Sequence, residues 1–206
     1  MFTPFQIPLL KRIAGQAIPT RTRRFAFRAA SMVSSKTSKM PTSSLSSLEF
    51  RKALGHFTTG VTVVTVEREP GKIHGMTANS FTSVSLDPML ILVCVDQHAK
   101  MLPLLEKKKH FGISVLKQNQ EAVSEYFAKR EHNAEAEQRL GIHFRQTPSG
   151  APVIEGTLLQ MSCKVIASHA AGDHTIFIAE VEDAELHEGE PLLYFRGEYR
   201  RIARHS

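Results

Sequence analysis

Residues 75–88 read GMTANSFTSVSLDP, and they concentrate Thr, Asn and Ser in a segment that would otherwise be a plain strand. The strongly apolar run from Met89 to Val95 follows at once. Hydroxyl and amide side chains along a rigid sheet edge offer many hydrogen-bond donors and acceptors. The pattern therefore suits a flat heteroaromatic ligand with a polyol phosphate tail. A polar edge strand, with Thr at positions that favour β-structure, explains the composition equally well.

The segments around this stretch predict a protein built mostly from strands. Short β-branched or alternating runs are separated by turn signals, and the few helical patterns are scattered between them. This arrangement indicates a mainly β, mostly antiparallel sheet closed as a β-barrel with peripheral helices. The predicted strands cover residues 61–66, 73–78, 80–85, 89–95, 111–116, 158–168, 174–186 and 192–195, and the predicted helices cover residues 48–57, 101–108, 119–130 and 134–140.

The composition is that of an ordinary globular protein. The chain has 206 residues, of which 42% are hydrophobic and 22% charged, and this length suits one domain with a substantial core. No apolar run approaches the roughly 18 residues that a membrane-spanning helix needs. Cys94 and Cys163 both lie in apolar strand-like runs. Two buried thiols are therefore a better interpretation than a disulfide framework.

The first part of the chain differs from the rest in charge. Residues 1–48 contain eight Lys or Arg and no Asp or Glu. Removing these eight from the 26 basic residues leaves 18 against 20 acidic residues, a net charge of −2. The basic character thus belongs to a leader, which argues against a nucleic-acid-binding surface on the folded body. We divide the chain into a leader at residues 1–45 and a folded domain at residues 46–206.

The leader is Arg-rich, Ser/Thr-rich and free of acids, which is typical of a mitochondrial transit peptide. The alternative is an upstream extension that does not belong to the protein, with Met32 or Met40 as the true start. In that case the expected location is cytoplasmic.

Several familiar site motifs are absent from the sequence. There is no GxGxxG, no Walker A loop, no HExxH and no GxSxG. His169 and His174 flank the turn at residues 171–173, but no cysteine or carboxylate lies at a suitable spacing to complete a metal site. We therefore expect no bound metal.

The chain from about residue 50 to residue 200 resembles the flavin reductase-like family, whose members form an FMN-binding split β-barrel. The segments that carry the resemblance run in family order: residues 60–65 (GVTVVT), 75–88, 92–95 (LVCV), 111–116 (FGISVL), 121–127, 172–174 (GDH) and 191–197 (PLLYFRG). The resemblance implies a homodimer with flavin bound near the subunit interface. It also implies reduction of FMN or FAD by NADH or NADPH, often to supply a partner monooxygenase.

This chemistry agrees with the lack of a catalytic triad. Hydride transfer from a nicotinamide to a flavin needs no acid, base or nucleophile from the protein, which has only to hold two rings in contact. The leading hypothesis is therefore an NAD(P)H:flavin oxidoreductase. The alternative is a non-catalytic flavin carrier or sensor on the same fold, and reductase activity with free flavin separates the two.

By resemblance, the flavin contacts come from two neighbouring strands and the loop that follows them. The candidate cofactor-binding residues are Thr77, Ala78, Asn79, Ser80, Cys94, Val95, Asp96 and Lys100. Relatives often place Ser in the loop after the second strand, where this chain has Ala99. Lys100 can replace that phosphate contact as a point charge, or it can be a solvated residue at the start of a helix.

His174 is the candidate catalytic residue. The resemblance places it in the Gly-Asp-His turn beside the flavin face, where it can contact the nicotinamide or the reduced flavin. Histidine exchanges a proton near neutral pH, although a turn histidine that bonds the hairpin backbone is the alternative. Asp173 is expected to shape the turn. Tyr194, Arg196 and Tyr199 are candidates for the nicotinamide pocket, and edge-strand packing explains the two tyrosines equally well.

Overall fold

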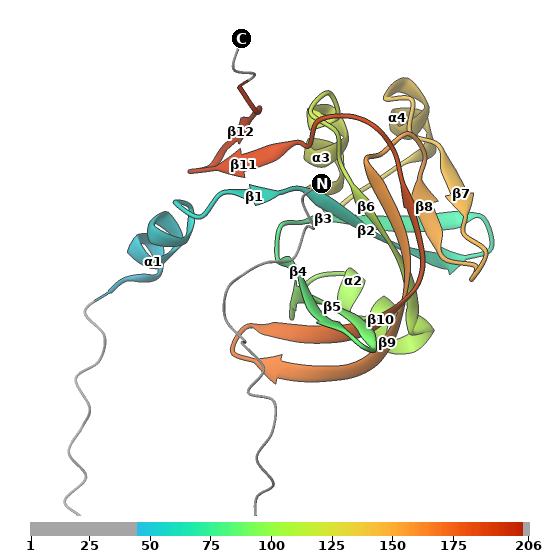
Figure 1. Cartoon of the computed structure of the whole chain (residues 1–206), viewed down its shortest axis with the longest axis horizontal. Coiled ribbons are helices and arrows are strands. Elements are labelled where there is room, and N and C mark those ends of the chain that lie inside the picture. The colour runs from blue at the N-terminus through green and yellow to red at the C-terminus, as the bar shows by residue number, and fades with distance from the viewer. Residues whose placement is uncertain (1–44, 204–206) are drawn as a thin grey trace, which may run out of the picture. The chain divides into compact units, whose positions relative to one another are not determined.

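A seven-stranded antiparallel sheet forms most of the computed structural model, which describes residues 45–203 (Figure 1). The predicted leader falls almost wholly on residues 1–44, which lie outside the described residues. The strand order is β3-β2-β6-β9-β10-β5-β4. The bounds are β2 Thr62–Glu69, β3 Lys72–Ala78, β4 Phe81–Leu86, β5 Met89–Asp96, β6 His110–Val115, β9 Leu159–Ala171 and β10 His174–Leu186.

The sheet curls into a split barrel. Its two edge strands, β3 and β4, are consecutive in the sequence and are joined only by Asn79 and Ser80. The long β9–β10 hairpin bends around the core, as Figure 1 shows. Register shifts between Ile178 and Ala179 and between Val181 and Asp183 accompany the bend, as expected for β-bulges. The predicted mainly β barrel is confirmed, and its two edges meet next to the polar stretch.

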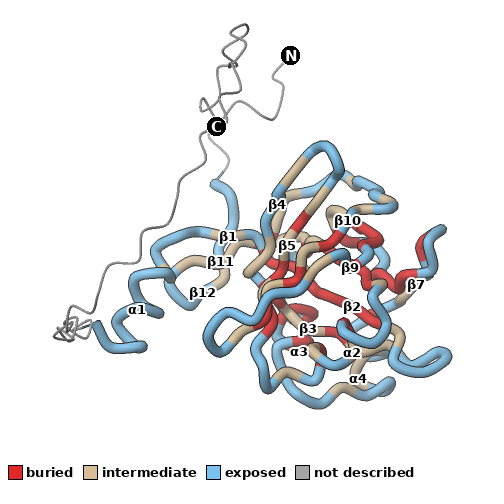
Figure 2. Tube along the Cα trace, turned by 90° about the horizontal axis from the view of Figure 1, so that it is seen from below, coloured by how far each residue is buried: buried red, intermediate tan, exposed pale blue. Residues whose placement is uncertain are grey.

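The barrel interior is filled by alternate residues of the strands and by one helix. Ile91, Val93 and Val95 of β5 point inward and are at most 5% exposed. Helix α2 (Met101–Lys108) adds the fully buried Met101 and Leu105 to the same cluster. Figure 2 shows this buried material concentrated in the middle of the strands, where a hydrophobic core is expected.

A second apolar cluster covers the other face of β2. Helix α3 (Glu121–Phe127) buries Val123, Tyr126 and Phe127 there, and α4 (Ala134–Arg139) packs at its margin. The two short strands β7 (Phe144–Gln146) and β8 (Pro152–Ile154) form a hairpin beside it. The hydroxyl of Thr65 donates a hydrogen bond to the carbonyl of Pro152 at 2.5 Å, which joins this hairpin to the barrel.

A small sheet and an exposed helix complete the fold. The sheet joins β1 (Thr59–Gly60), β11 (Leu193–Phe195) and β12 (Glu198–Arg200) in the order β1-β11-β12. Helix α1 (Ser47–Leu54) begins with a capping box between Ser46 and Glu49 and buries none of its residues. In Figure 2, α1 lies on the side of the barrel and is exposed along its length.

The structure moves most of the predicted bounds by one to three residues and adds four strands. The strands predicted at 61–66 and 158–168 run on to Glu69 and Ala171. The helix predicted at 48–57 ends at Leu54, the one predicted at 119–130 spans only Glu121–Phe127, and the strand predicted at 80–85 begins at Phe81. The strands β1, β7, β8 and β12 were not predicted. In the part of the chain that is described, no helix is long and apolar enough to cross a membrane.

Candidate functional site

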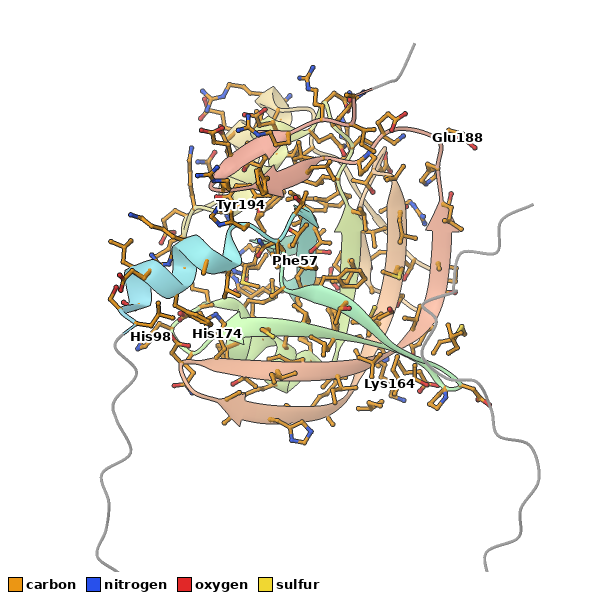
Figure 3. All side chains as sticks on the ribbon, turned by 60° about the vertical axis from the view of Figure 1, so that its left-hand side comes forward. Phe57, His98, Lys164, His174, Glu188 and Tyr194 are labelled. Carbon is orange, nitrogen blue, oxygen red and sulfur yellow. The ribbon has the colours of Figure 1, made fainter. Side chains whose placement is uncertain are left out.

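A groove of about 1010 Å³ lies between α1, the β4–β5 hairpin and the turn from β11 to β12. Figure 3 shows Phe57 between Tyr194 above it and His174 below it. Apolar side chains, among them Phe57, Phe81 and Leu92, form much of its wall. The volume reaches the top of the range of about 300–1,000 Å³ that is usual for small-molecule sites.

The polar stretch contributes Asn79 and Ser80 to this groove. The hydroxyl of Ser80 donates to the carbonyl of Cys94 at 2.8 Å and accepts from the Cys94 amide at 3.3 Å. Ser80 is therefore occupied in joining β4 to β5, whereas Asn79 is exposed and its side-chain amide makes no hydrogen bond within residues 45–203. The Asn79 amide is therefore available to a ligand, whereas the Ser80 hydroxyl is already hydrogen-bonded.

Thr77 and Ala78 do not line the groove. The hydroxyl of Thr77 donates to the carbonyl of Ser124 in α3 at 2.7 Å, and Ala78 is only 8% exposed. The carbonyl of Ala78 accepts a hydrogen bond from Thr62 at 2.7 Å. In this structure the hydrogen bonds of both residues join β3 to α3 and β2. Their assignment to flavin binding stays a prediction.

The candidate residues at the end of β5 also differ in where their side chains lie. Cys94 lines the groove, whereas the side chain of Val95 is fully buried in the barrel interior. Asp96 ends β5 and is exposed, and its carboxylate accepts from the amide of His98 at 2.7 Å. That hydrogen bond lowers the pKa of Asp96, so this carboxylate is ionised at neutral pH.

Lys100 lies outside the groove lining and has a protein partner. It occupies the N-cap position of α2, and its ammonium contacts the carboxylate of Glu131 at 2.6 Å. The side chains are 54% and 85% exposed, so the pair contributes little to stability. A phosphate contact by Lys100 stays a prediction, and it requires competition with Glu131.

His174 begins β10 in the β9–β10 hairpin and is not among the residues that line the groove. Its Nδ1 lies 2.7 Å from the carboxylate of Asp173, and its backbone pairs with Asp96 across the sheet. The hydrogen bond from His174 is the main cause of a lowered pKa for Asp173, and Arg51 of α1 adds to it. This contact fixes the imidazole through Nδ1 and leaves Nε2 for another partner.

Two of the three candidates near the C-terminus line the groove. Tyr194 and Arg196 do so, whereas the hydroxyl of Tyr199 donates to Ser124 at 2.9 Å. The Tyr194 and Tyr199 rings meet edge to face at a centroid distance of 5.5 Å. Tyr199 thus packs against the Tyr194 ring without lining the groove itself.

The structure adds a wall that sequence reasoning missed. Leu48, Arg51 and Lys52 of α1 and its C-cap residue Gly55 line the groove, and His56 and Phe57 follow them. The first four recur at positions i, i+3, i+4 and i+7, the spacing of one helix face. That spacing was the available signal, although its mixture of apolar and basic residues does not itself identify a binding face.

The two cysteines differ in their surroundings, which corrects the expectation that both are buried. Both are free thiols, but Cys94 is half-buried at the groove and only Cys163 is fully buried. Burial raises the pKa of both thiols, and that of Cys163 reaches about 12. Among residues 45–203, no three side chains of the metal-ligating types gather into a site.

The arrangement suits ring binding better than acid–base chemistry. Aromatic and aliphatic walls can contact the faces of planar rings, and the Asn79 amide offers one donor group and one acceptor. Of the described residues, those that line the groove include no carboxylate. A reaction that transfers hydride between two stacked rings needs no more from the protein than binding and orientation.

Comparison with known proteins gives a family match over most of the folded chain. The model of the flavin reductase like domain matches residues 54–203. This span includes the whole barrel and both predicted strands of the candidate site, and it begins at the last residue of α1.

Relatives agree with the family match. An NADH-dependent flavin reductase of Rhodococcus sp. is 43% identical over 157 residues, which cover 75% of this chain and 86% of that one. The reductase component of 4-hydroxyphenylacetate 3-monooxygenase from Thermus thermophilus is 40% identical over 154 residues, covering 74% and 95% of the two chains. The solved structure of a Streptomyces globisporus NADH:FAD oxidoreductase in complex with NAD and FAD fragments superposes with a TM-score of 0.69 at 39% identity, covering 76% and 92%. The chain therefore belongs to the flavin reductase-like family.

Proposed function

We propose that this protein is a flavin reductase that oxidises NADH and accepts FMN or FAD. The observation that carries the proposal is the groove, in which broad apolar walls meet the unpaired amide of Asn79. A flavin bound there supplies the hydride-accepting ring, so the chain has only to bind and orient the two reactants. The relatives named above are reductases of this kind, which supports the assignment.

Each groove residue then has a physical task. Asn79 donates and accepts hydrogen bonds at the polar edge of the flavin ring, while Phe57, Phe81 and Leu92 contact the ring faces and exclude water. Ser80 keeps the Cys94 backbone in register at the wall of the groove. His174, oriented by Asp173, lies outside the groove lining and would reach the nicotinamide through its Nε2.

The direct test is turnover by the purified full-length chain. We expect NADH to be oxidised only when FMN or FAD is added, and the reaction mixture without flavin is the control. Binding of flavin without NADH oxidation would support the carrier or sensor instead. NADPH in place of NADH determines the donor preference.

We further propose that the reduced flavin serves a partner monooxygenase. The Thermus thermophilus relative is the reductase component of such a system. The groove is open to solvent along α1, whose residues are all exposed, so a product can leave without rearrangement of the core. Release of reduced flavin into solution, measured with an oxygenase that lacks its own reductase, tests this proposal.

A homodimer accounts for an apolar surface that a monomer leaves open. Strand β5 is apolar on both faces, and the outer face carries Leu90 and Leu92, which are only partly buried. The neighbouring strand β10 adds Ile176 and Ile178 to the same outer face. Strands with apolar residues on both faces are usually covered on both. A second copy of this chain is the occupant that the family resemblance supports.

We propose a mitochondrial targeting role for the leader on the basis of its composition. Its eight basic residues and lack of acids within residues 1–48 favour import into the mitochondrial matrix. The family match begins only at residue 54, so the leader is separate from the part shared with relatives. Residues 1–45 fused to a fluorescent protein should direct it to mitochondria, and a diffuse cytoplasmic signal would contradict the proposal.

A further inference from the structure

The groove is lined by cations without an accompanying carboxylate. Arg51 and Lys52 come from α1 and Arg196 from the β11–β12 turn, while no Asp or Glu of residues 45–203 is among the lining residues. Within residues 45–203 none of the three forms an ion pair, although Arg68, Lys72, Lys100, Arg145 and Arg200 do. Three cations that have no ion-pair partner among the described residues therefore line the groove where the proposed ligand binds.

Backbone contacts bring these three cations together from distant parts of the sequence. The amide of Arg196 donates to the carbonyl of Gly55 at 2.8 Å, which ties the turn to the end of α1. At Gly55 the missing Cβ would lie only 3.5 Å from the Cα of Arg196, so the two backbones are in contact. Arg196 has a left-handed φ of 53°, which is uncommon for a residue other than glycine. The fold thus holds Arg196 beside the helix that carries Arg51 and Lys52.

The rest of the groove indicates what kind of anion these cations bind. The polar edge at Asn79 belongs to the sheet wall, whereas the cations belong to the helix and turn walls. The volume of about 1010 Å³ exceeds what one flavin ring needs and leaves room for a long ligand. Arginine binds phosphate oxygens through two parallel hydrogen bonds, and lysine adds a compact positive charge.

We propose that Arg51, Lys52 and Arg196 form an anion subsite that binds the diphosphate of a dinucleotide lying in the groove. The inference rests on the proposed function for the identity of the dinucleotide, which is either the donor NADH or the acceptor FAD. Both carry the same adenosine diphosphate group, and FMN lacks it. Arg51 acts electrostatically on Asp173, but that carboxylate bonds His174 and forms no ion pair with Arg51, so Arg51 remains available to the ligand.

The first test measures binding of ADP-ribose, which carries the diphosphate but no redox-active ring. The double variant Arg51→Gln/Lys52→Gln removes two charges while keeping residues that favour a helix. We expect ADP-ribose to bind the full-length protein about tenfold more weakly after this change, because two charge-assisted contacts in a partly solvated groove are lost. Arg196→Gln should weaken binding in the same direction.

The matched control is Lys107→Gln/Lys108→Gln in α2, which removes the same charge outside the groove lining. ADP-ribose affinity should not change in this control. Higher salt should weaken binding to the unmodified protein more than to the Arg51→Gln/Lys52→Gln variant. Unchanged affinity in both groove variants, or no binding of ADP-ribose to the unmodified protein, would overturn the subsite.

Steady-state kinetics then identify the source of the diphosphate. A higher KM for NADH with FMN as the acceptor assigns the subsite to the donor. A higher KM for FAD, with the KM for FMN unchanged, assigns it to the flavin. Equal increases for FMN and FAD would mean that a single phosphate is bound, which contradicts the proposal. Charge-dependent ADP-ribose binding without any NADH oxidation would retain the subsite and refute the reductase instead.

Discussion

Neighbouring residues of the polar stretch at 75–88 have opposite roles in the structure. Thr77 and Ser80 use their hydroxyls to bond Ser124 and Cys94, so they hold the strands together. Asn79, between them, is exposed and keeps its amide free of partners within residues 45–203. The concentration of hydrogen-bonding side chains thus serves mainly to build the sheet edge, and one residue of it remains for the ligand.

The Asn79→Leu substitution tests that assignment. It removes the free amide and places a bulkier apolar side chain at the groove, so flavin affinity should fall by more than about 1 kcal/mol. Titration of flavin fluorescence measures the dissociation constant. Asn119→Leu is the matched control, because Asn119 is also exposed and does not line the groove. Equal affinities in the unmodified protein and the Asn79 variant would remove Asn79 from the site.

The two thiols offer an independent probe of the groove. Cys94 is half-buried and lines it, whereas Cys163 is fully buried with a pKa raised to about 12. Because the thiolate is the reactive form, alkylation at mildly alkaline pH should modify one thiol per native chain. Bound flavin should slow that modification, and Cys94→Ser should abolish it. Mass spectrometry locates the label, and labelling of Cys163 in the native protein would contradict this burial.

At the scale of elements, the sequence predicts what depends on local pattern. The strands β2, β5, β6, β9 and β10 carry long β-branched or alternating runs, and the structure confirms them within a few residues. The hairpin of β7 and β8 has three residues a strand, too few to establish a period, and Thr65 of the barrel helps to hold it. Its existence depends on tertiary contacts, which a local pattern cannot contain.

Because local patterns do not contain tertiary contacts, they predict one wall of the groove and not the other. The sheet wall with Asn79, Ser80 and Cys94 follows from one compact stretch and the strand after it. The helix wall with Arg51 and Lys52 comes from a segment that the sequence presents as an ordinary amphipathic helix. The groove lining and the hydrogen bond between Arg196 and Gly55 show that α1 and the C-terminal turn enclose the groove, and no local sequence pattern contains such a contact.

Where β6 packs against β8, replacing Gly112 by alanine should strongly destabilise the fold. A Cβ added at Gly112 would lie 1.9 Å from the carbonyl oxygen of Pro152, which is backbone and cannot rotate away. Gly112→Ala should therefore lower the free energy of unfolding by about 3 kcal/mol. Gly60→Ala is the control, since nothing lies within 4 Å of its added Cβ, and it should stay within about 0.5 kcal/mol. Denaturant unfolding of both variants measures the difference.

The contact between β3 and the segment after α3 should make stability depend on pH. His74 and His132 pack with ring centroids 5.4 Å apart, and burial, His132, Lys100 and Arg68 together lower the pKa of His74 to about 4, while Glu131 opposes the shift. Between the unfolded value near 6.5 and the folded value, the unfolded chain binds a proton that the folded chain does not. The free energy of unfolding should therefore decrease as the pH falls from about 6.5 to about 4.

Denaturant unfolding across that pH range measures the effect. His74→Gln stays neutral throughout and should weaken the dependence, to which His132 still contributes because burial lowers its pKa as well. His98→Gln, at a histidine whose side chain is 81% exposed, should leave it as it is. An equal pH dependence in the unmodified protein and the His74 variant would show that His74 does not cause it.

For the whole molecule, the apolar outer face of β5 and β10 is the feature that a single barrel does not explain. The inner face of β10 buries Phe177 and Ala179 in the core, while Ile176 and Ile178 on the outer face are only partly covered. The groove adjoins this face through Leu92 and Cys94 of β5. A second copy placed there would cover the apolar strip and stand next to the bound ligand. Assembly and function would then depend on the same strands.

The Ile176→Glu/Ile178→Glu variant tests this arrangement, because it would bury two charges at the proposed interface and leave the barrel core untouched. We expect light scattering to give twice the mass of one chain for the unmodified protein and the mass of one chain for the variant.

A stable interface usually covers about 800 Å² on each partner, so two buried carboxylates at its centre should prevent association at micromolar concentration. Leu140→Glu, at an exposed residue after α4, is the control and should remain dimeric. If the variant also loses flavin affinity although its thermal unfolding is unchanged, the binding site depends on the second copy. A monomeric unmodified protein would refute the interface and leave the apolar strip to another partner.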